Sequence, residues 1–178
     1  DFALLPVYAA MKAYTHQTPV MYPGWFQEDH WAVTWSAGWY TATDPGATFG
    51  ALRATTQPGA LLRFVFSGTD LILVTYRGPR AGALSVSVDG GPARSYDLHS
   101  EASEFQYRLL TARGLRDGRH TATIVSESGD NFIDGFIVRR VPDRTGWLMA
   151  AMVAGLGVAW FMARRGGDEG RKTDDEGA

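Results

Sequence analysis

Residues 31 to 138 are a succession of short segments in which apolar and polar residues alternate, separated by turns rich in Gly, Pro and Asp. The clearest segment is Ala83–Val88 (ALSVSV), and the Asp89-Gly90-Gly91 that follows it is a strong hairpin signal. Almost no stretch of this region shows the 3.6-residue period of a helix. We therefore predict a mainly β fold, an antiparallel jelly-roll β-sandwich of about eight strands over residues 31–140.

A second feature is the apolar stretch at residues 147–163, WLMAAMVAGLGVAWFMA, which holds no charged residue and is followed by Arg164 and Arg165. With the two residues in front it approaches the roughly 20 residues that an α-helix needs to cross a membrane. Trp147 and Trp160 lie near its ends, where aromatic rings favour the membrane interface. We predict one transmembrane helix here. A buried core helix is the less favoured alternative, because core helices seldom run this long without a polar face.

The flanks of this stretch suggest a topology. Residues 141–146 are predicted to be a linker, and residues 164–178, Gly-rich and of mixed charge, a disordered tail. Basic residues occur on both flanks, so charge counting does not orient the helix, but a long N-terminal domain translocates largely regardless of its charge. We expect a single-pass protein of the cell membrane with the domain outside and the tail in the cytoplasm.

Composition narrows the class of protein. The chain has 178 residues, no cysteine and a formal net charge of -2. Disulfides, thiol catalysis and Cys-based metal sites are excluded, and the charge gives no nucleic-acid footprint. A cysteine-free exported domain favours a bacterial envelope. The chain begins at Asp1 without a methionine, so we expect a processed protein or the end of a longer one.

The N-terminal residues differ from the rest. In residues 1–17, Pro6 suits the first turn of a helix, and the spacing of Val7, Ala10, Met11 and Tyr14 predicts an amphipathic helix. Residues 18–30 hold two prolines and are predicted to be a turn-rich connector.

Aromatic residues crowd into positions 25 to 40. Sugars present C–H faces that stack on aromatic rings, so exposed rings here would form a carbohydrate platform. Trp31 and Trp35 share one predicted strand face with Val33 and are expected to fill the core. Successive residues of a strand point to opposite faces, so at least one of Trp39 and Tyr40 should be exposed. The predicted ligand-binding residues are Trp25, Trp39 and Tyr40.

The order of several short motifs resembles the galactose-binding-like β-sandwich domains. These are Gly68-Thr69, Val86-Ser87-Val88-Asp89-Gly90, Gly114-Leu115-Arg116-Asp117-Gly118-Arg119-His120 and Ile133-Asp134-Gly135-Phe136. The resemblance covers roughly residues 31–140 and implies the architecture; such domains often bind sugars as accessory modules of glycoside hydrolases. Residues 3–14, ALLPVYAAMKAY, are similar to the helix that closes the (β/α)8 barrel of glycoside hydrolases, which implies a catalytic barrel upstream of Asp1.

Three residues within these motifs are predicted to be structural. Asp89 precedes Gly90 and is expected to accept local backbone N–H groups. His120 begins a strand and is expected to brace the turn before it. Asp134 interrupts an apolar strand, which demands a buried partner, for which Arg63 is a candidate, or a bulge at Gly135.

No catalytic constellation is predicted in this chain. Glu28 and Asp29 are the only adjacent acidic pair before the tail, and neighbouring side chains on an extended chain point apart, unlike the paired carboxyls of a glycosidase. The four histidines show no close ligand spacing, so no metal site is predicted. No cofactor is predicted; a structural calcium ion at loop carboxylates is kept as an alternative, although no dense Asp/Asn loop occurs.

The function predicted from sequence is a membrane-anchored, non-catalytic, extracytoplasmic module that presents a carbohydrate- or envelope-binding surface. Its expected partners are the membrane and a polysaccharide or cell-wall glycan, with no nucleic acid. One alternative is the C-terminal accessory and anchor portion of a glycoside hydrolase whose barrel lies upstream. Another is an accessory subunit of a larger membrane complex.

Overall fold

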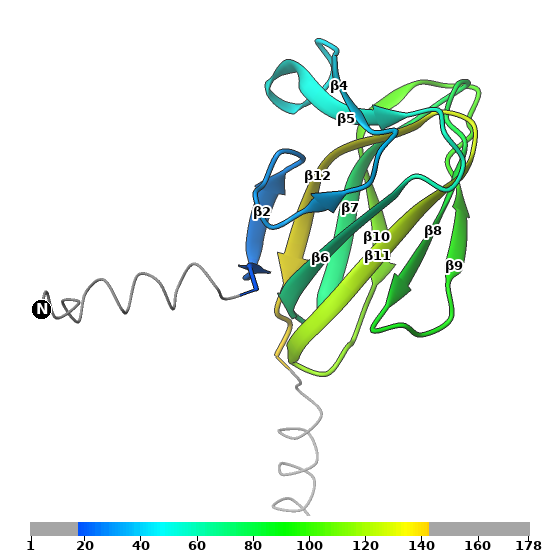
Figure 1. Ribbon diagram of the computed structural model, residues 1–178. Helices are drawn as coiled ribbons and strands as arrows, with labels where there is room; N and C mark the ends of the chain where they lie inside the picture. The colour runs from blue at the N-terminus through cyan, green and yellow to red at the C-terminus, as the bar shows by residue number, and fades with distance from the viewer. Residues whose placement is uncertain (1–17, 143–178) are drawn as a thin grey trace, which may run out of the picture. The chain divides into compact units, whose positions relative to one another are not determined.

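The computed structural model describes residues 18–142, which form two β-sheets (Figure 1). The segments predicted as an N-terminal helix (1–17), a transmembrane helix (147–163) and a tail (164–178) lie outside the described residues, as does most of the predicted linker (141–146). Within residues 18–142, no helix combines the length and the hydropathy that a membrane crossing requires.

Twelve strands and one short 3-10 turn make up the described part of the chain. They are β1 (Val20–Met21), β2 (Gly24–Gln27), β3 (Thr34–Trp35), β4 (Tyr40–Thr43), η1 (Thr48–Gly50), β5 (Ala51–Thr55), β6 (Leu61–Gly68), β7 (Asp70–Arg77), β8 (Ala83–Val88), β9 (Arg94–Asp97), β10 (Glu104–Ala112), β11 (Gly118–Ser128) and β12 (Asn131–Arg139).

The strands divide into two six-stranded sheets. Sheet A has the order β1-β6-β11-β8-β9, with β3 also paired to β6. Sheet B has the order β10-β7-β12-β5-β4, with β2 also paired to β12. All pairings are antiparallel except that of β1 with β6.

The core lies between the two sheets, where the apolar residues of each alternating strand meet. Phe64 of β6 and Phe136 of β12 contact each other across the sandwich, with ring centroids 4.7 Å apart, and Phe66 and Leu84 are fully buried beside them. The prediction of a mainly β, two-sheet sandwich is confirmed. The number of strands exceeds the predicted eight, because strands of two to four residues contain too few alternations to be recognised in the sequence.

Residues 18–30, predicted to be a connector, contribute a strand to each sheet. β1 pairs with Val65 and Phe66 of β6, and β2 pairs with residues 135–138 of β12. Met21 of β1 is fully buried. The described part of the sandwich therefore begins at Val20, because backbone pairing to longer strands stabilises even two-residue elements that no local signal marks.

The prediction that Trp31 fills the core is wrong. The N–H of His30 donates to the carbonyl of Gln27 and that of Val33 to the carbonyl of His30, so residues 27–33 form turns in place of a strand. Trp31 is 67% exposed, whereas Val33 is buried. The two-residue face alternation applies only to extended chain, and β3 begins at Thr34.

Two strands pair with the same edge of β12, one after the other along its length. Residues 131–133 of β12 pair with β5, and residues 135–138 pair with β2. At the junction the β12–β7 register shifts between Ile133 and Gly135. A Cβ at Gly135 would lie 2.5 Å from the carbonyl oxygen of Phe26, so only glycine permits this close approach of β2.

Candidate functional site

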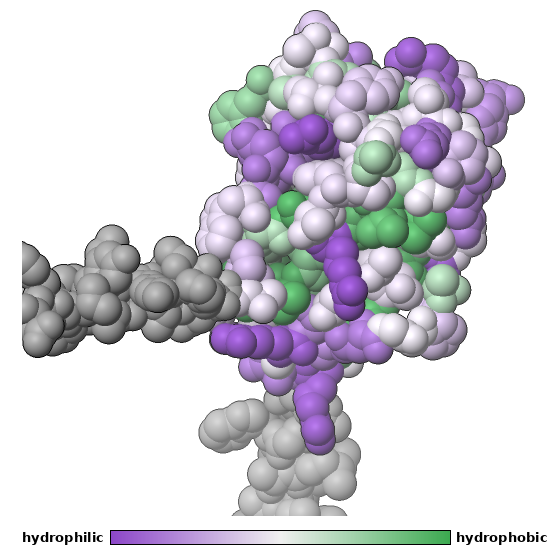
Figure 2. All heavy atoms as spheres, viewed as in Figure 1, coloured by the Kyte–Doolittle hydropathy of each residue, from purple (hydrophilic) through white to green (hydrophobic). Residues whose placement is uncertain are grey.

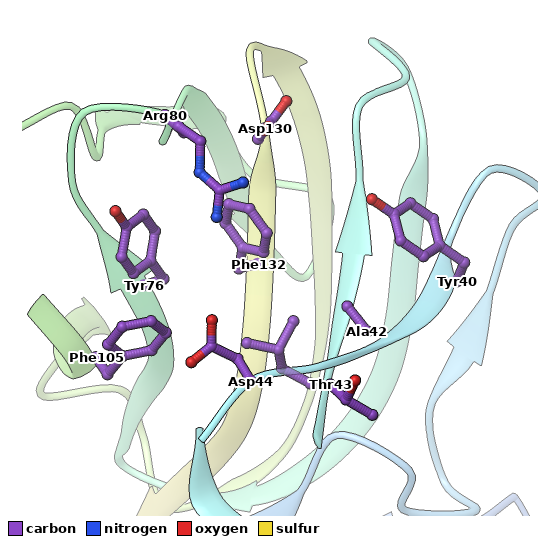
Figure 3. Close-up of a pocket in the computed structure, with 10 residues that line it drawn as sticks. Tyr40, Ala42, Thr43, Asp44, Tyr76, Arg80, Phe105, Asp130 and Phe132 are labelled. Atoms are coloured by element: carbon purple, nitrogen blue, oxygen red, sulfur yellow. The ribbon is translucent and has the colours of Figure 1, made fainter. Parts of the chain in front are cut away.

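A pocket of about 200 Å³ opens on sheet B and the loops at its edge (Figure 3). Strands β4, β5, β7, β10 and β12 and three loops beside them supply its walls. Its lining residues are Tyr40, Ala42, Thr43, Asp44, Leu52, Tyr76, Arg80, Phe105, Asp130 and Phe132.

Three aromatic rings form one wall of the pocket. The ring of Tyr76 lies 5.0 Å from that of Phe105 and 5.3 Å from that of Phe132. The Tyr76 hydroxyl lies 2.9 Å from Ser103 Oγ, which fixes the ring. A Cβ at Gly78 would lie 2.1 Å from that hydroxyl, so the glycine makes room for it. Tyr76 is buried in the core, and Phe105 and Phe132 are half-buried, so these two rings present only part of their surface to the pocket.

Two charged residues flank this wall. The guanidinium carbon of Arg80 lies 5.7 Å from the centre of the Phe132 ring, over its face. Arg80 and Asp130 come from separate loops that are joined by backbone: Asp130 N–H donates to the Arg80 carbonyl (3.3 Å), and Gly82 N–H donates to the Asp130 carbonyl (2.8 Å). Among the described residues, neither the Arg80 guanidinium nor the Asp130 carboxylate has a side-chain hydrogen-bond partner, and Figure 3 shows the guanidinium beside the rings and the carboxylate turned away from them.

Close contact between these two loops depends on glycine. A Cβ at Gly82 would lie 1.7 Å from the carbonyl oxygen of Ser128. Gly129, in the facing turn, has a φ of +62°. The two positions bring the loops into backbone contact and thereby hold Arg80 beside Asp130.

The opposite side of the pocket is the loop of residues 44–50, here called the 44–50 loop. Its Asp44 points its carboxylate toward Phe105 and Tyr76 (Figure 3), and Asp44 Oδ1 accepts the Gly46 N–H at 2.9 Å. Gly46 itself lies against Phe105, because a Cβ there would be 2.6 Å from that ring. The loop thus begins at β4, at one edge of sheet B, and reaches β10 at the other.

Asp134 of β12 holds the 44–50 loop in place through hydrogen bonds with Thr48. It is 2% exposed, and its two carboxylate oxygens accept the Thr48 N–H at 3.0 and 3.1 Å and the Thr48 hydroxyl at 3.0 Å. Burial raises the pKa of this carboxyl, and the bonds from Thr48 only partly oppose that effect. Arg63, the candidate partner, lies on β6 of the other sheet, opposite Thr34, whereas the alternative of a bulge at Gly135 agrees with the register shift between Ile133 and Gly135.

Glu28 is a second buried acid close to this anchor. It is 5% exposed, and its Oε2 has no hydrogen-bond partner among residues 18–142. Burial raises the pKa of Glu28, and the charges of Asp29 and Asp134 act in the same direction, outweighing the opposing effects of its own backbone N–H and Arg53.

Glu28→Gln is expected to raise the free energy of unfolding at pH 7 by about 1 kcal/mol, because an unpaired buried charge is removed. A carboxyl with a raised native pKa binds its proton more readily in the folded state, so its contribution to stability falls as pH rises from the unfolded pKa to the native one. The gain should therefore shrink on acidification toward pH 4.5. Urea unfolding at both pH values measures it, with the exposed Glu101→Gln as control; equal stability of Glu28→Gln and wild type at pH 7 would contradict it.

The three predicted ligand-binding residues occupy different places. Tyr40, 50% exposed, lines the pocket. Trp39 does not; its ring packs edge-on against Trp35 at 5.0 Å, and its Nε1 is buried with no hydrogen-bond partner in the described part of the chain. Trp25, 40% exposed, lies on β2 with its ring 6.4 Å from that of Phe49.

Most residues that line the pocket were not predicted from the sequence to bind a ligand. Asp44 stands before Pro45 and Gly46, and Arg80 lies in the Gly- and Pro-rich loop after β7. Charged residues in such loops are a usable signal for binding sites. Phe105 and Phe132 stand in alternating strands, where the pattern alone does not distinguish a core position from a pocket wall.

The other predicted motif residues lie in sheet A, where they brace a turn. Asp89 Oδ1 accepts the Thr121 N–H at 2.7 Å, and Asp89 Oδ2 lies 2.7 Å from His120 Nδ1. Burial lowers the pKa of His120, but its bonds to Asp89 and to the Arg116 carbonyl outweigh burial and leave the pKa raised. Within residues 18–142, no three His, Asp or Glu side chains gather as metal ligands would.

Comparisons with known proteins show similarity of fold and of nothing finer. No protein-family model matches the sequence, and no curated protein does. Several solved structures are similar. A family two carbohydrate esterase from Cellvibrio japonicus has a TM-score of 0.52 at 15% identity, over 66% of this chain and 33% of that one. A two-domain esterase (CEX) active on acetylated mannans, co-crystallised with mannopentaose, has a TM-score of 0.52 at 11% identity, over 66% and 36%.

A Paenibacillus xanthan lyase has a TM-score of 0.53 at 14% identity, over 70% of this chain and 14% of that one. The chain is a β-sandwich. It spans about a third of the length of the two esterases and less of the lyase. At these identities the similarity shows a shared sandwich and carries no site residue across.

Proposed function

We propose that this sandwich is a non-catalytic module that binds a carbohydrate in the pocket of sheet B. The observation that carries the proposal is the composition of the pocket: an aromatic wall of Tyr76, Phe105 and Phe132 faces Asp44 and is flanked by Arg80. A pyranose ring has an apolar C–H face and a rim of hydroxyl groups. The exposed parts of Phe105 and Phe132 suit the face, and the Arg80 guanidinium and the Asp44 carboxylate suit the hydroxyls.

The volume of the pocket limits the size of the ligand that it can hold. About 200 Å³ is below the roughly 300–1,000 Å³ of ordinary small-molecule sites. One sugar ring, most simply the end of a chain, fits this volume better than an oligosaccharide does. The ten lining residues include two carboxylates, Asp44 and Asp130, and no His, Ser, Cys or Lys.

The setting of the module is part of the proposal. The apolar residues 147–163 would hold the sandwich at the cell membrane, with the domain outside and the C-terminal residues in the cytoplasm. The ligand would then be a polysaccharide or a glycan of the envelope. The motif order that resembles galactose-binding-like domains supports the same assignment.

A second candidate function is an accessory module of a carbohydrate-active enzyme. Its support is the size of the similar structures: two carbohydrate esterases and a xanthan lyase contain a similar sandwich within much longer chains. The resemblance of residues 3–14 to the closing helix of glycoside hydrolase barrels points the same way.

Arg80→Ala tests the binding function. The full chain is purified in a detergent without a sugar headgroup, and its affinity for manno- and cello-oligosaccharides is measured by isothermal titration calorimetry. We expect Arg80→Ala to lower the affinity about tenfold, because it removes one charged hydrogen-bond donor from the site. The matched control is Arg94→Ala, on the edge strand β9 of sheet A, which should bind as wild type does. Equal affinity of Arg80→Ala and wild type would exclude the pocket as the site.

A further inference from the structure

Phe49 is an exposed aromatic residue with an unusual backbone conformation. It is 84% exposed, and its backbone has a φ of +53° and a ψ of 19°. A bulky aromatic residue in the left-handed region is a conformational outlier, and such strain gathers at functional sites. Burial within the described part of the chain does not explain this ring.

A second ring stands beside it. The Trp25 ring lies 6.4 Å from that of Phe49 at an interplanar angle of 63°, and Trp25 is itself 40% exposed. A Cβ at Gly135 would lie 3.4 Å from the Trp25 ring, so that ring packs against β12 at this residue. In Figure 2, apolar (green) atoms project at the corner that the segment between β4 and β5 occupies in Figure 1.

The 44–50 loop contributes to both the pocket and the pair of rings. Asp44, at one end of the 44–50 loop, lines the pocket, and Phe49 stands near the other end. Between them Ala47 is buried and Thr48 is bonded to Asp134. The Asp44 N–H donates to the Gly50 carbonyl at 3.1 Å and closes the loop. One constrained loop therefore fixes the pocket and the exposed ring together.

We infer that Trp25 and Phe49 form a second subsite for the same saccharide chain, contacting the apolar face of a sugar beyond the one held in the pocket. The inference rests on the proposed function. The two rings carry no charge, so they recognise C–H faces and do not select for acidic or basic sugars. The ligand class is thus an oligosaccharide bound by its end, and this subsite sets no requirement on its charge.

The test compares a sugar with its oligomer. Mannose and mannopentaose, and glucose and cellopentaose, are titrated into the full chain in the same detergent. The variant is Phe49→Asn, since Asn tolerates the left-handed region and removes only the ring. We expect wild type to bind the better pentaose about tenfold more tightly than its monosaccharide, and Phe49→Asn to lose that factor while its monosaccharide affinity stays unchanged.

Leu61→Asn, at an exposed apolar position of sheet A, is the matched control and should bind as wild type does. If Arg80→Ala weakens pentaose binding but Phe49→Asn leaves it unchanged, this inference is overturned and the proposed function stands. Equal losses for monosaccharide and pentaose would show that Phe49 acts through the pocket, and would also overturn it. If Phe49→Asn leaves sugar affinity unchanged but dissociates a dimer that light scattering detects in wild type, the rings serve self-association and the inference is overturned. Binding of neither pentaose by wild type would overturn the proposed function and this inference together.

Discussion

Replacing Gly82 with alanine is expected to lower the free energy of unfolding by about 3 kcal/mol, because a new Cβ is forced into packed backbone. That Cβ would lie 1.7 Å from the Ser128 carbonyl oxygen and 2.6 Å from Gly129 Cα. Backbone atoms of a turn cannot rotate away as the end of a flexible side chain can, so the two loops must separate. The change should also displace Arg80 from Asp130 and lower sugar affinity about tenfold or more.

Gly118→Ala is the matched control. A Cβ at Gly118 meets no atom within 4 Å, and the residue has no positive φ. Its substitution should leave stability unchanged or raise it by a few tenths of a kcal/mol, by about the entropy that alanine removes from the unfolded chain. Urea unfolding followed by tryptophan fluorescence measures both variants. A Gly82→Ala protein with the midpoint of wild type would show that the loops do not need their backbone contact.

Removing the carboxyl of Asp134 is expected to release the 44–50 loop. Asp134→Ala takes away the acceptor of the Thr48 N–H and hydroxyl in a buried place, which should cost about 2 kcal/mol of stability. Sugar affinity should fall with it, because Asp44 and Phe49 are both positioned by this loop. Asp134→Asn keeps an oxygen for Thr48 and carries no buried charge, so it should stay within about 1 kcal/mol of wild type.

The pH dependence separates charge from shape at this position. Burial raises the pKa of Asp134 above its ordinary 3.8, so the folded protein takes up a proton that the unfolded chain has released. Stability from this group therefore falls as pH rises from about 3.8 to the native pKa, and is constant above it. Asp134→Asn should lack this slope in unfolding measured between pH 4 and 7. An Asn variant as unstable as the Ala variant would show that the charge itself holds Thr48.

The predictions that succeeded rest on local pattern. Ala83–Val88 alternates cleanly and is β8, and the Asp89-Gly90 signal that follows is a turn with φ values of +55° and +69°. The predictions that failed lie where local pattern is short or misleading. Trp31 stands in a run that alternates, but two successive turns remove it from any strand. β1 and β2 carry no strand signal and exist because β6 and β12 offer them partners.

The candidate site was only partly visible in the sequence. Tyr40 was predicted to bind ligand and lines the pocket, because a residue beside Trp39 on extended chain must face the other way. Phe49 was missed, since neither its strained backbone nor its exposure follows from its neighbours. Asp134 was recognised as a residue that needs a buried partner, but the partner is 86 residues away in Thr48, where no spacing rule reaches.

The sequence by itself determined that residues 31–140 form alternating strands joined by turns, because the two-residue period and the glycines act over a few neighbouring positions. Only the tertiary structure decided which strands pair and where the chain opens a pocket. Arg80 lies beside Phe132, and Gly46 beside Phe105, across separations that only sheet pairing closes. Which residues form the site depends on contacts between distant segments, and a local sequence pattern carries no record of them.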